Sequence, residues 1–314
     1  MLFHIRLMIN ESLSHRNDLG TPLDGNRPGP ARSAAPEEAF GYGRDFLENK
    51  FVYLVISPRA RGLSIGVNVN PIVNCTFHCL YCEVDRSRPA LVSRFDVERM
   101  AAELRSTYTL ASSGGLRQRP RYAHLSPDLL QVRHVTLSGD GEPTLSNNFV
   151  EALEAVIHLR TAGGLPFFKI VLVTNSTALH RPEVQDGLKF FTRSDEIWAK
   201  LDGGTQDYLS RINRATVPLE KIMDNILLVA RQRPVVIQSL FPAFNGKPPP
   251  KIEIMEYAHR LKELKEAGGE ISLVQIYSAT RPMAKTGCSH LPLKDLSQIA
   301  KTVRRVAGLR AEVF

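Results

Sequence analysis

The alternation of apolar, strand-like runs with amphipathic helical segments constrains the fold of this chain more than any other feature. Strand-like runs are expected at 63–70, 134–138, 168–174, 196–201, 235–240, 271–277 and 310–314. Helical segments are expected between them, at 93–108, 147–162, 219–229, 252–267 and 293–307. Such alternation predicts parallel βα units in an α/β fold. Six units fit a partial (β/α)6 barrel better than a closed barrel of eight strands.

Three cysteines follow the first expected strand on a short loop. Cys75, Cys79 and Cys82 have the spacing Cys-x-x-x-Cys-x-x-Cys, which is close enough for three thiolates to hold one metal centre. A zinc site would usually need a second Cys or His pair, and none follows within reach. A 4Fe–4S cluster on three thiolates leaves one iron open for a ligand that is not protein.

Polar residues mark the ends of the later strands. Because the carboxyl ends of parallel strands meet at one mouth, these residues are expected to face a common site. The residues expected there are Gly139, Asp140, Gly141, Glu142, Pro143, Thr174, Asn175, Lys200, Asp202 and Tyr277. Glycines let backbone approach a ligand closely, and the acidic groups can meet an ammonium. Lys200 could pair with a carboxylate or an anionic substrate, or it could be a rim charge.

The three-cysteine spacing, with Tyr81 before the last cysteine, resembles the signature of the S-adenosylmethionine (SAM) radical superfamily. The resemblance implies the partial barrel fold and a 4Fe–4S cluster on Cys75, Cys79 and Cys82, whose open iron is chelated by SAM. It also implies reductive cleavage of SAM to methionine and a 5′-deoxyadenosyl radical, which abstracts hydrogen from a substrate. The protein supplies binding and orientation.

Further motifs extend the resemblance. The segment from Gly139 to Pro143 is similar to the superfamily's Gly-Gly-Glu-Pro motif, which holds the SAM amino group; Asp140 replaces a glycine. Thr174-Asn175 is similar to an element that reaches the ribose or methionine part of SAM, and Lys200-Leu-Asp202 to a Ser-Leu-Asp element. Tyr81 is implied to lie beside the cluster and to pack on adenine. Tyr277 lies on the strand where the superfamily holds adenine.

Stand-alone radical SAM proteins similar to the wyosine-forming tRNA synthase are the nearest resemblance. It rests on the segments at 64–68, 138–145, 200–202 and 274–277, followed by Arg281-Pro282. The wyosine enzymes carry extra cysteines for a second cluster. No cysteine precedes Cys75 here, so a second cluster of that kind is not expected.

The composition indicates a soluble globular protein with an anionic partner. The net charge is +8 and the pI is about 9.4, which favours nucleic acid, a phosphorylated substrate or an acidic electron-transfer protein. Flavodoxin or ferredoxin is the expected reductant, and a tRNA base is one candidate substrate. No apolar run is long enough for a membrane helix, and four cysteines without a secretory signal favour a cytoplasmic location.

Residues 1–40 are rich in Gly, Pro and Ser and are expected to form a mobile arm, while 41–314 form the barrel domain, with 290–314 packed on it. Some roles stay open at this stage. Arg59, Arg61 and Arg281 could bind a substrate anion or form surface ion pairs, and the parts played by Gln238 and Cys288 are undecided.

Three alternatives to a base-modifying enzyme remain. Glycyl-radical activases also have short chains and a single cluster, and a small-molecule radical SAM enzyme is equally compatible with the motifs. A protein of another class, a nucleic-acid-binding module with a structural metal at the same cysteines, would show no turnover.

Overall fold

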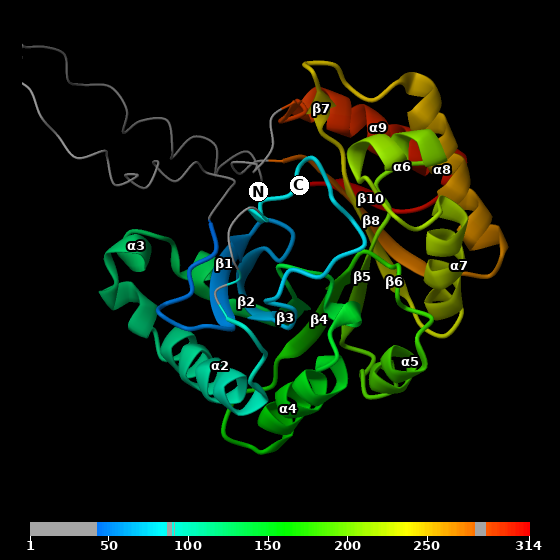
Figure 1. Cartoon of the computed structure of the whole chain (residues 1–314). Helices are drawn as coiled ribbons and strands as arrows, with labels where there is room; N and C mark the ends of the chain where they lie inside the picture. The colour runs from blue at the N-terminus through cyan, green and yellow to red at the C-terminus, as the bar shows by residue number, and fades with distance from the viewer. Residues whose placement is uncertain (1–42, 87–89, 91, 280–286) are drawn as a thin grey trace, which may run out of the picture. The chain divides into compact units, whose positions relative to one another are not determined.

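The computed structural model describes residues 43–86, 90, 92–279 and 287–314 (Figure 1). The chain divides into two units, 1–37 and 38–314, and all described residues belong to the second. The expected N-terminal arm at 1–40 therefore lies outside the described residues. Within the described part, no helix is both long and apolar enough to cross a membrane.

A curved, mostly parallel sheet forms the centre of the described unit. Its strand order is β1-β2-β3-β4-β5-β6-β8-β10, and only β1 pairs antiparallel to its neighbour. The strands are β1 (Val52–Ser57), β2 (Gly62–Asn68), β3 (Val132–Ser138), β4 (Lys169–Thr174), β5 (Glu196–Lys200), β6 (Val235–Leu240), β8 (Ile271–Tyr277) and β10 (Ala311–Val313). A separate two-stranded sheet pairs β7 (Ala243–Phe244) with β9 (Cys288–Ser289).

Helices follow the parallel strands and flank the outer face of the sheet (Figure 1). They are α2 (Val97–Ser112), α3 (Pro120–Ala123), α4 (Phe149–Thr161), α5 (Pro182–Leu188), α6 (Gln206–Ile212), α7 (Leu219–Ala230), α8 (Lys251–Glu266) and α9 (Leu293–Ala307). Short 3₁₀ turns are η1 (Gly115–Gln118), η2 (Pro127–Leu130) and η3 (Pro143–Leu145). The expected partial (β/α)6 barrel is confirmed, with β1 and β10 added at the two edges of the sheet.

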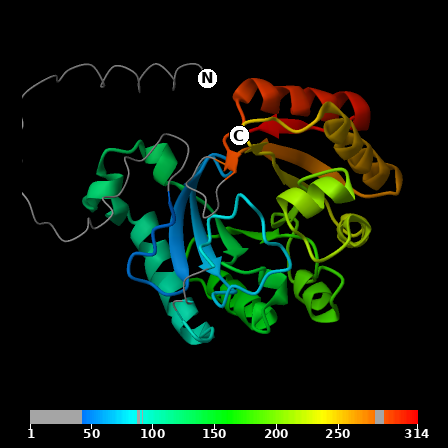
Figure 2. The ribbon, with the colours of Figure 1, turned by 45° about the horizontal axis from the view of Figure 1, so that its top comes forward.

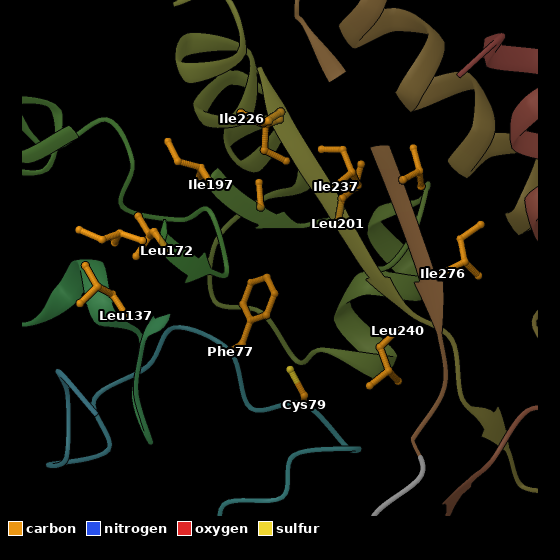
Figure 3. Close-up of a cluster of buried hydrophobic side chains, with 14 of the residues drawn as sticks. Phe77, Cys79, Leu137, Leu172, Ile197, Leu201, Ile226, Ile237, Leu240 and Ile276 are labelled. Atoms are coloured by element: carbon orange, nitrogen blue, oxygen red, sulfur yellow. The ribbon is translucent and has the colours of Figure 1, made fainter. Parts of the chain in front are cut away.

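The two faces of the sheet bury different side chains, as the period of two along a strand requires. Figure 3 shows Leu137, Leu172, Ile197, Ile237 and Ile276 on successive strands, in one buried cluster with Ile226 of α7. A second buried cluster contains Val171, Trp198 and Val236, which alternate along β4, β5 and β6 with members of the first. Both faces of the central strands are therefore covered, as parallel sheets require.

Two parts of the chain differ from the sequence expectation. The stretch at 111–133, where no helix or strand was expected, contains η1, α3 and η2 and buries Leu116 and Tyr122. Strand β1 was not expected. It forms a hairpin with β2 in which Gly66 lies opposite Tyr53, and a Cβ at Gly66 would come within 2.2 Å of the Tyr53 ring. The aromatic ring occupies the space that any other side chain at 66 would need.

Candidate active site at the strand ends

The cysteine loop, residues 69–84, leaves β2 at its carboxyl end and is fixed on one side by the segment that follows β3. Gly141 N donates to Asn70 O (2.9 Å), and Glu142 N donates to Asn74 O (2.8 Å). The Asn70 side chain donates to the carbonyls of both Asn74 (3.0 Å) and Glu142 (2.8 Å). A Cβ at Gly141 would lie 2.2 Å from Asn74 O, so glycine is required for this contact.

The other side of the cysteine loop is held by the segment that follows α6. His78 N donates to Asn213 O (2.9 Å) and Leu80 N donates to Ile212 O (2.9 Å). Thr216 N donates to Thr76 O (3.0 Å). In Figure 2 this loop, in cyan, runs from β2 across the open side of the sheet. Backbone hydrogen bonds on both sides thus fix where the three cysteines lie.

The three thiols differ in burial and in their hydrogen bonds. Cys79 is 8% exposed, while Cys75 and Cys82 are half-buried. Asn175 Nδ2 lies 3.5 Å from Cys75 Sγ, and Asn213 Nδ2 lies 3.5 Å from Cys79 Sγ. Burial, followed by the charge of Asp202, raises the pKa of the Cys79 thiol to about 12, and burial is also the main cause of the raised pKa of Cys75. A metal that binds these thiols must displace their protons.

The donor set fits an iron–sulfur cluster in its chemistry. Three cysteines from one loop supply thiolates, and amide N–H groups point at two of the sulfurs, as around iron–sulfur clusters. Among the described residues, no three His, Cys, Asp or Glu side chains are grouped to hold a single metal ion. A 4Fe–4S cluster binds each thiolate to a different iron, so its sulfurs need not meet at one ion.

Glu142 contacts two of the other residues expected at the mouth, Thr174 and Asn175, and its neighbour Thr144. Its carboxylate accepts hydrogen bonds from Thr144 Oγ1 (2.6 Å), Thr174 Oγ1 (2.5 Å) and Asn175 N (2.7 Å), and it is 3% exposed. Burial raises the pKa of Glu142, although these hydrogen bonds oppose the shift. The structure therefore places a buried acid at the ends of β3 and β4, in the segment that holds the cysteine loop.

Asp140 is tied to the other side of the same turn. Its carboxylate pairs with Arg44 (2.6 Å) and accepts from Asn68 Nδ2 (2.9 Å), while Asp140 N donates to Asn68 Oδ1 (2.9 Å). Gly139 begins this turn and Pro143 opens η3. Through these contacts Asp140 holds the turn against β2. A contact between Asp140 and SAM stays a prediction.

A buried ionic cluster joins the cysteine loop to β5, β6 and β8. Asp202 is fully buried and accepts from Leu240 N (2.8 Å) and from the hydroxyl of Tyr81. Lys200 Nζ lies 3.2 Å from Asp202 Oδ1 and 3.3 Å from the hydroxyl of Tyr277, and 5.1 Å from the centre of the Tyr81 ring. Burial disfavours the ammonium, but Asp202, Tyr277 and Cys79 outweigh it, so the pKa of Lys200 is raised. The neighbouring carboxylate of Asp202 thus favours the charged ammonium form of Lys200.

The residues with open roles occupy different places. The Arg59 guanidinium lies 4.1 Å from the centre of the Tyr277 ring, so it reaches the expected site. Arg61 pairs with Glu312 of β10 (3.1 Å). Gln238 Nε2 lies 3.5 Å from Gln275 Oε1, with both side chains buried. Cys288 is buried on β9, outside the cysteine loop, and Arg281 lies outside the described residues.

Sequence reasoning missed three side chains of the site. The first, Asn70, holds the cysteine loop. The second, Arg44, pairs with Asp140, and the third, Asn213, donates to Asp202. Asn70 could have been suspected because it ends the first expected strand just before the cysteines. Arg44 and Asn213 are distant in sequence from their partners and stand in no motif, so only the fold reveals them.

Comparison with known proteins gives relatives over about half of the chain. No family model matches. UPF0026 protein slr1464 of Synechocystis is 32% identical over 179 residues, which are 56% of this chain and 57% of that protein. UPF0026 protein MJ1312 of Methanocaldococcus jannaschii is 24% identical over 55% of this chain and 47% of its own length. A protein named GTPase Obg from Brachyspira hyodysenteriae is 19% identical, over 58% of this chain and 23% of that protein. The aligned part thus covers 57%, 47% and 23% of the lengths of these three relatives.

Two solved structures share the fold. A radical SAM methyltransferase from Sphaerobacter thermophilus superposes with a TM-score of 0.58 at 15% identity, covering 84% of this chain and 68% of that one. TYW1, in a structure with a lysine–pyruvate adduct bound, superposes with a TM-score of 0.50 at 16% identity, covering 81% and 84%. These likenesses confirm, at the level of the fold, the resemblance to the radical SAM superfamily.

Proposed function

We propose that this chain, which has the partial-barrel fold of radical SAM enzymes, is itself such an enzyme and holds a 4Fe–4S cluster on Cys75, Cys79 and Cys82. The observation that carries the proposal is the position of the three-cysteine loop. Backbone hydrogen bonds hold it between the acid-bearing turn after β3 and the segment after α6, at the carboxyl ends of the strands. When bound, the cluster supplies the electron that cleaves SAM to methionine and a 5′-deoxyadenosyl radical, which removes hydrogen from a substrate.

The residues around the loop have separate tasks in this proposal. Glu142 accepts the SAM ammonium on Oε2, which within the described part of the chain accepts a hydrogen bond from Asn175 N alone. The close approach at Gly141 fixes the loop against this acid. Lys200 stays protonated and presents a positive charge near Cys79, where it favours a carboxylate of SAM or of the substrate. Burial of Cys79 and Tyr81 limits the access of water.

The substrate in this proposal is anionic, with a tRNA base as one candidate, and the electron donor is an acidic protein such as flavodoxin or ferredoxin. The net charge of +8 supports an anionic partner, and the Lys200 ammonium and the Arg59 guanidinium, which both contact Tyr277, support an anion within the site. The salt dependence of binding distinguishes a nucleic acid from a small anion.

Metal analysis tests the proposal against a structural-metal module. Protein purified anaerobically and reconstituted with iron and sulfide should contain about four irons and four sulfides per chain, as a 4Fe–4S cluster requires. The Cys75→Ala, Cys79→Ala and Cys82→Ala variants should lose them, whereas Cys288→Ala should retain them. One tightly held zinc per chain, with no incorporation of iron and sulfide, would refute the proposal and favour the module.

A further inference from the structure

Asn213 lies where the cysteine loop, α6 and the Asp202 cluster meet. Its side chain is fully buried. Nδ2 lies 2.6 Å from Asp202 Oδ2, 2.8 Å from the hydroxyl of Tyr81 and 3.5 Å from Cys79 Sγ. A similar amide contact reaches Cys75 from Asn175. The three acceptors around Nδ2 come from the cysteine loop and from the segment that follows β5, and they share the two N–H groups of this amide. Asn213 therefore connects a cysteine with the buried carboxylate just after β5.

The orientation of the Asn213 amide is decided by its surroundings. A flipped amide would place its oxygen against the carboxylate of Asp202, which repels it, and would remove the donor from Tyr81 and Cys79. In the orientation observed, Oδ1 is buried and no donor in the described part of the chain reaches it. An unsatisfied buried oxygen destabilises the folded protein, and such a group calls for an explanation. The amide thus faces Cys79 although its own oxygen lacks a partner.

The surrounding elements fix the place of Asn213 relative to Cys79. Its carbonyl accepts from His78 N (2.9 Å), so the residue before Cys79 is bound to the backbone of Asn213 itself. Thr205 caps the start of α6 by accepting from Tyr208 N (3.2 Å), and Glu253 of α8 accepts from Gly204 N (2.6 Å). Contacts at both ends of α6 therefore hold the amide near the sulfur.

We propose that Asn213 is a positioning residue that donates an N–H to the Cys79 sulfur and thereby raises the reduction potential of the cluster. This inference rests on the proposed function, which places a 4Fe–4S cluster on that sulfur. One-electron reduction adds negative charge to the cluster and its thiolates. An N–H dipole directed at a thiolate stabilises the more negative, reduced form, and hydrogen bonds to the sulfurs are among the factors that set such potentials. Asn213 would then favour the uptake of the electron that SAM cleavage consumes.

The test is an electron paramagnetic resonance titration with dithionite, without SAM, on reconstituted full-length protein. Asn213→Leu keeps the branch at Cγ, is larger at its two terminal methyl groups and has no side-chain N–H. It is expected to take up iron and sulfide like the wild type and to show a midpoint potential shifted to more negative values. Asn49→Ala is the matched control, because Asn49 donates hydrogen bonds to Val52 O (3.1 Å) and Thr107 Oγ1 (3.0 Å), away from the cysteine loop. This control should leave the midpoint potential unchanged.

A purely structural role for Asn213 would lower the melting temperature and leave the potential at the wild-type value. That result in a cluster-loaded Asn213→Leu protein would overturn the inference, as would a shift to less negative potential. If Asn213→Leu does not fold, Asn213→Ser, which keeps a small polar side chain but cannot reach the sulfur in the same way, provides the same measurement and the same criterion. Failure of the wild type to form any reducible cluster would instead refute the proposed function, and the two failures are thus distinguishable.

Discussion

At the scale of single residues, His134 links burial on β3 to the pH dependence of stability. The side chain is 2% exposed and packs edge-on against Trp198. Burial, with the cations Lys169 and Arg59, lowers its pKa to about 3. In the unfolded chain the imidazole takes up a proton near pH 6.5, so the unfolded state binds more protons between about pH 6.5 and 3. We expect the free energy of unfolding to fall with decreasing pH in that window, by at most about 1.4 kcal/mol per pH unit from this residue.

Urea denaturation between pH 4 and 7 measures this effect. His134→Leu should show a shallower fall in the free energy of unfolding than the wild type, whereas His124→Leu, at an exposed position, should keep the wild-type slope. Equal slopes in wild type and His134→Leu would show that the native His134 titrates normally.

The Lys200–Asp202 pair makes a second prediction at this scale. The side chains are 14% and 0% exposed. Lys200→Met leaves a buried carboxylate without its cation, which should lower the free energy of unfolding by about 3 kcal/mol. Because the pKa of Lys200 is raised, the stability that the pair provides is present throughout pH 6–9 and is lost only at higher pH, above the ordinary lysine pKa.

A double-mutant cycle with Asp202→Asn checks the pairing. The double variant should lose less stability than the sum of the two single variants, because the second substitution removes the charge that the first left unpaired. Strict additivity at neutral pH would contradict a coupled pair.

At the scale of elements, the contact between the turn after β3 and the cysteine loop makes a prediction about cluster assembly. A methyl group at Gly141 would meet the backbone of Asn74, which cannot move without shifting the loop. Gly141→Ala should therefore reduce iron and sulfide incorporation severalfold while circular dichroism shows a folded barrel. Gly43→Ala is the control, since the nearest heavy atom to its added Cβ is an arginine side chain at 3.9 Å. Normal loading of Gly141→Ala would show that the loop tolerates displacement.

The elements also show how far sequence reasoning reaches. Periodicity found the parallel strands and the long helices, because each buries a regular set of apolar positions. It missed β1, whose residues are buried almost throughout and so show no alternation, and the seven-residue helices α5 and α6, which are too short for a helical stripe. Motifs identified the cysteines, Glu142 and Asp202, while Asn213 needed the fold.

At the scale of the whole molecule, the positive net charge predicts how a nucleic-acid substrate would bind. If the substrate is tRNA, the logarithm of the binding constant should fall linearly with the logarithm of salt concentration, by about 0.7–0.9 for each phosphate contacted. Filter binding of a tRNA transcript at salt concentrations from about 50 to about 300 mM measures this slope. Binding that is absent, or insensitive to salt, would remove tRNA as the substrate and favour a small anion or a protein.

The central claim is that the strand-end site cleaves SAM reductively, and the release of 5′-deoxyadenosine tests it most directly. Cluster-loaded protein incubated anaerobically with SAM and dithionite should release 5′-deoxyadenosine and methionine, detected by chromatography and mass spectrometry. Cys79→Ala should release neither, and Cys288→Ala should behave like the wild type. Release of no 5′-deoxyadenosine from wild-type protein with an intact, reduced 4Fe–4S cluster would contradict the proposed function.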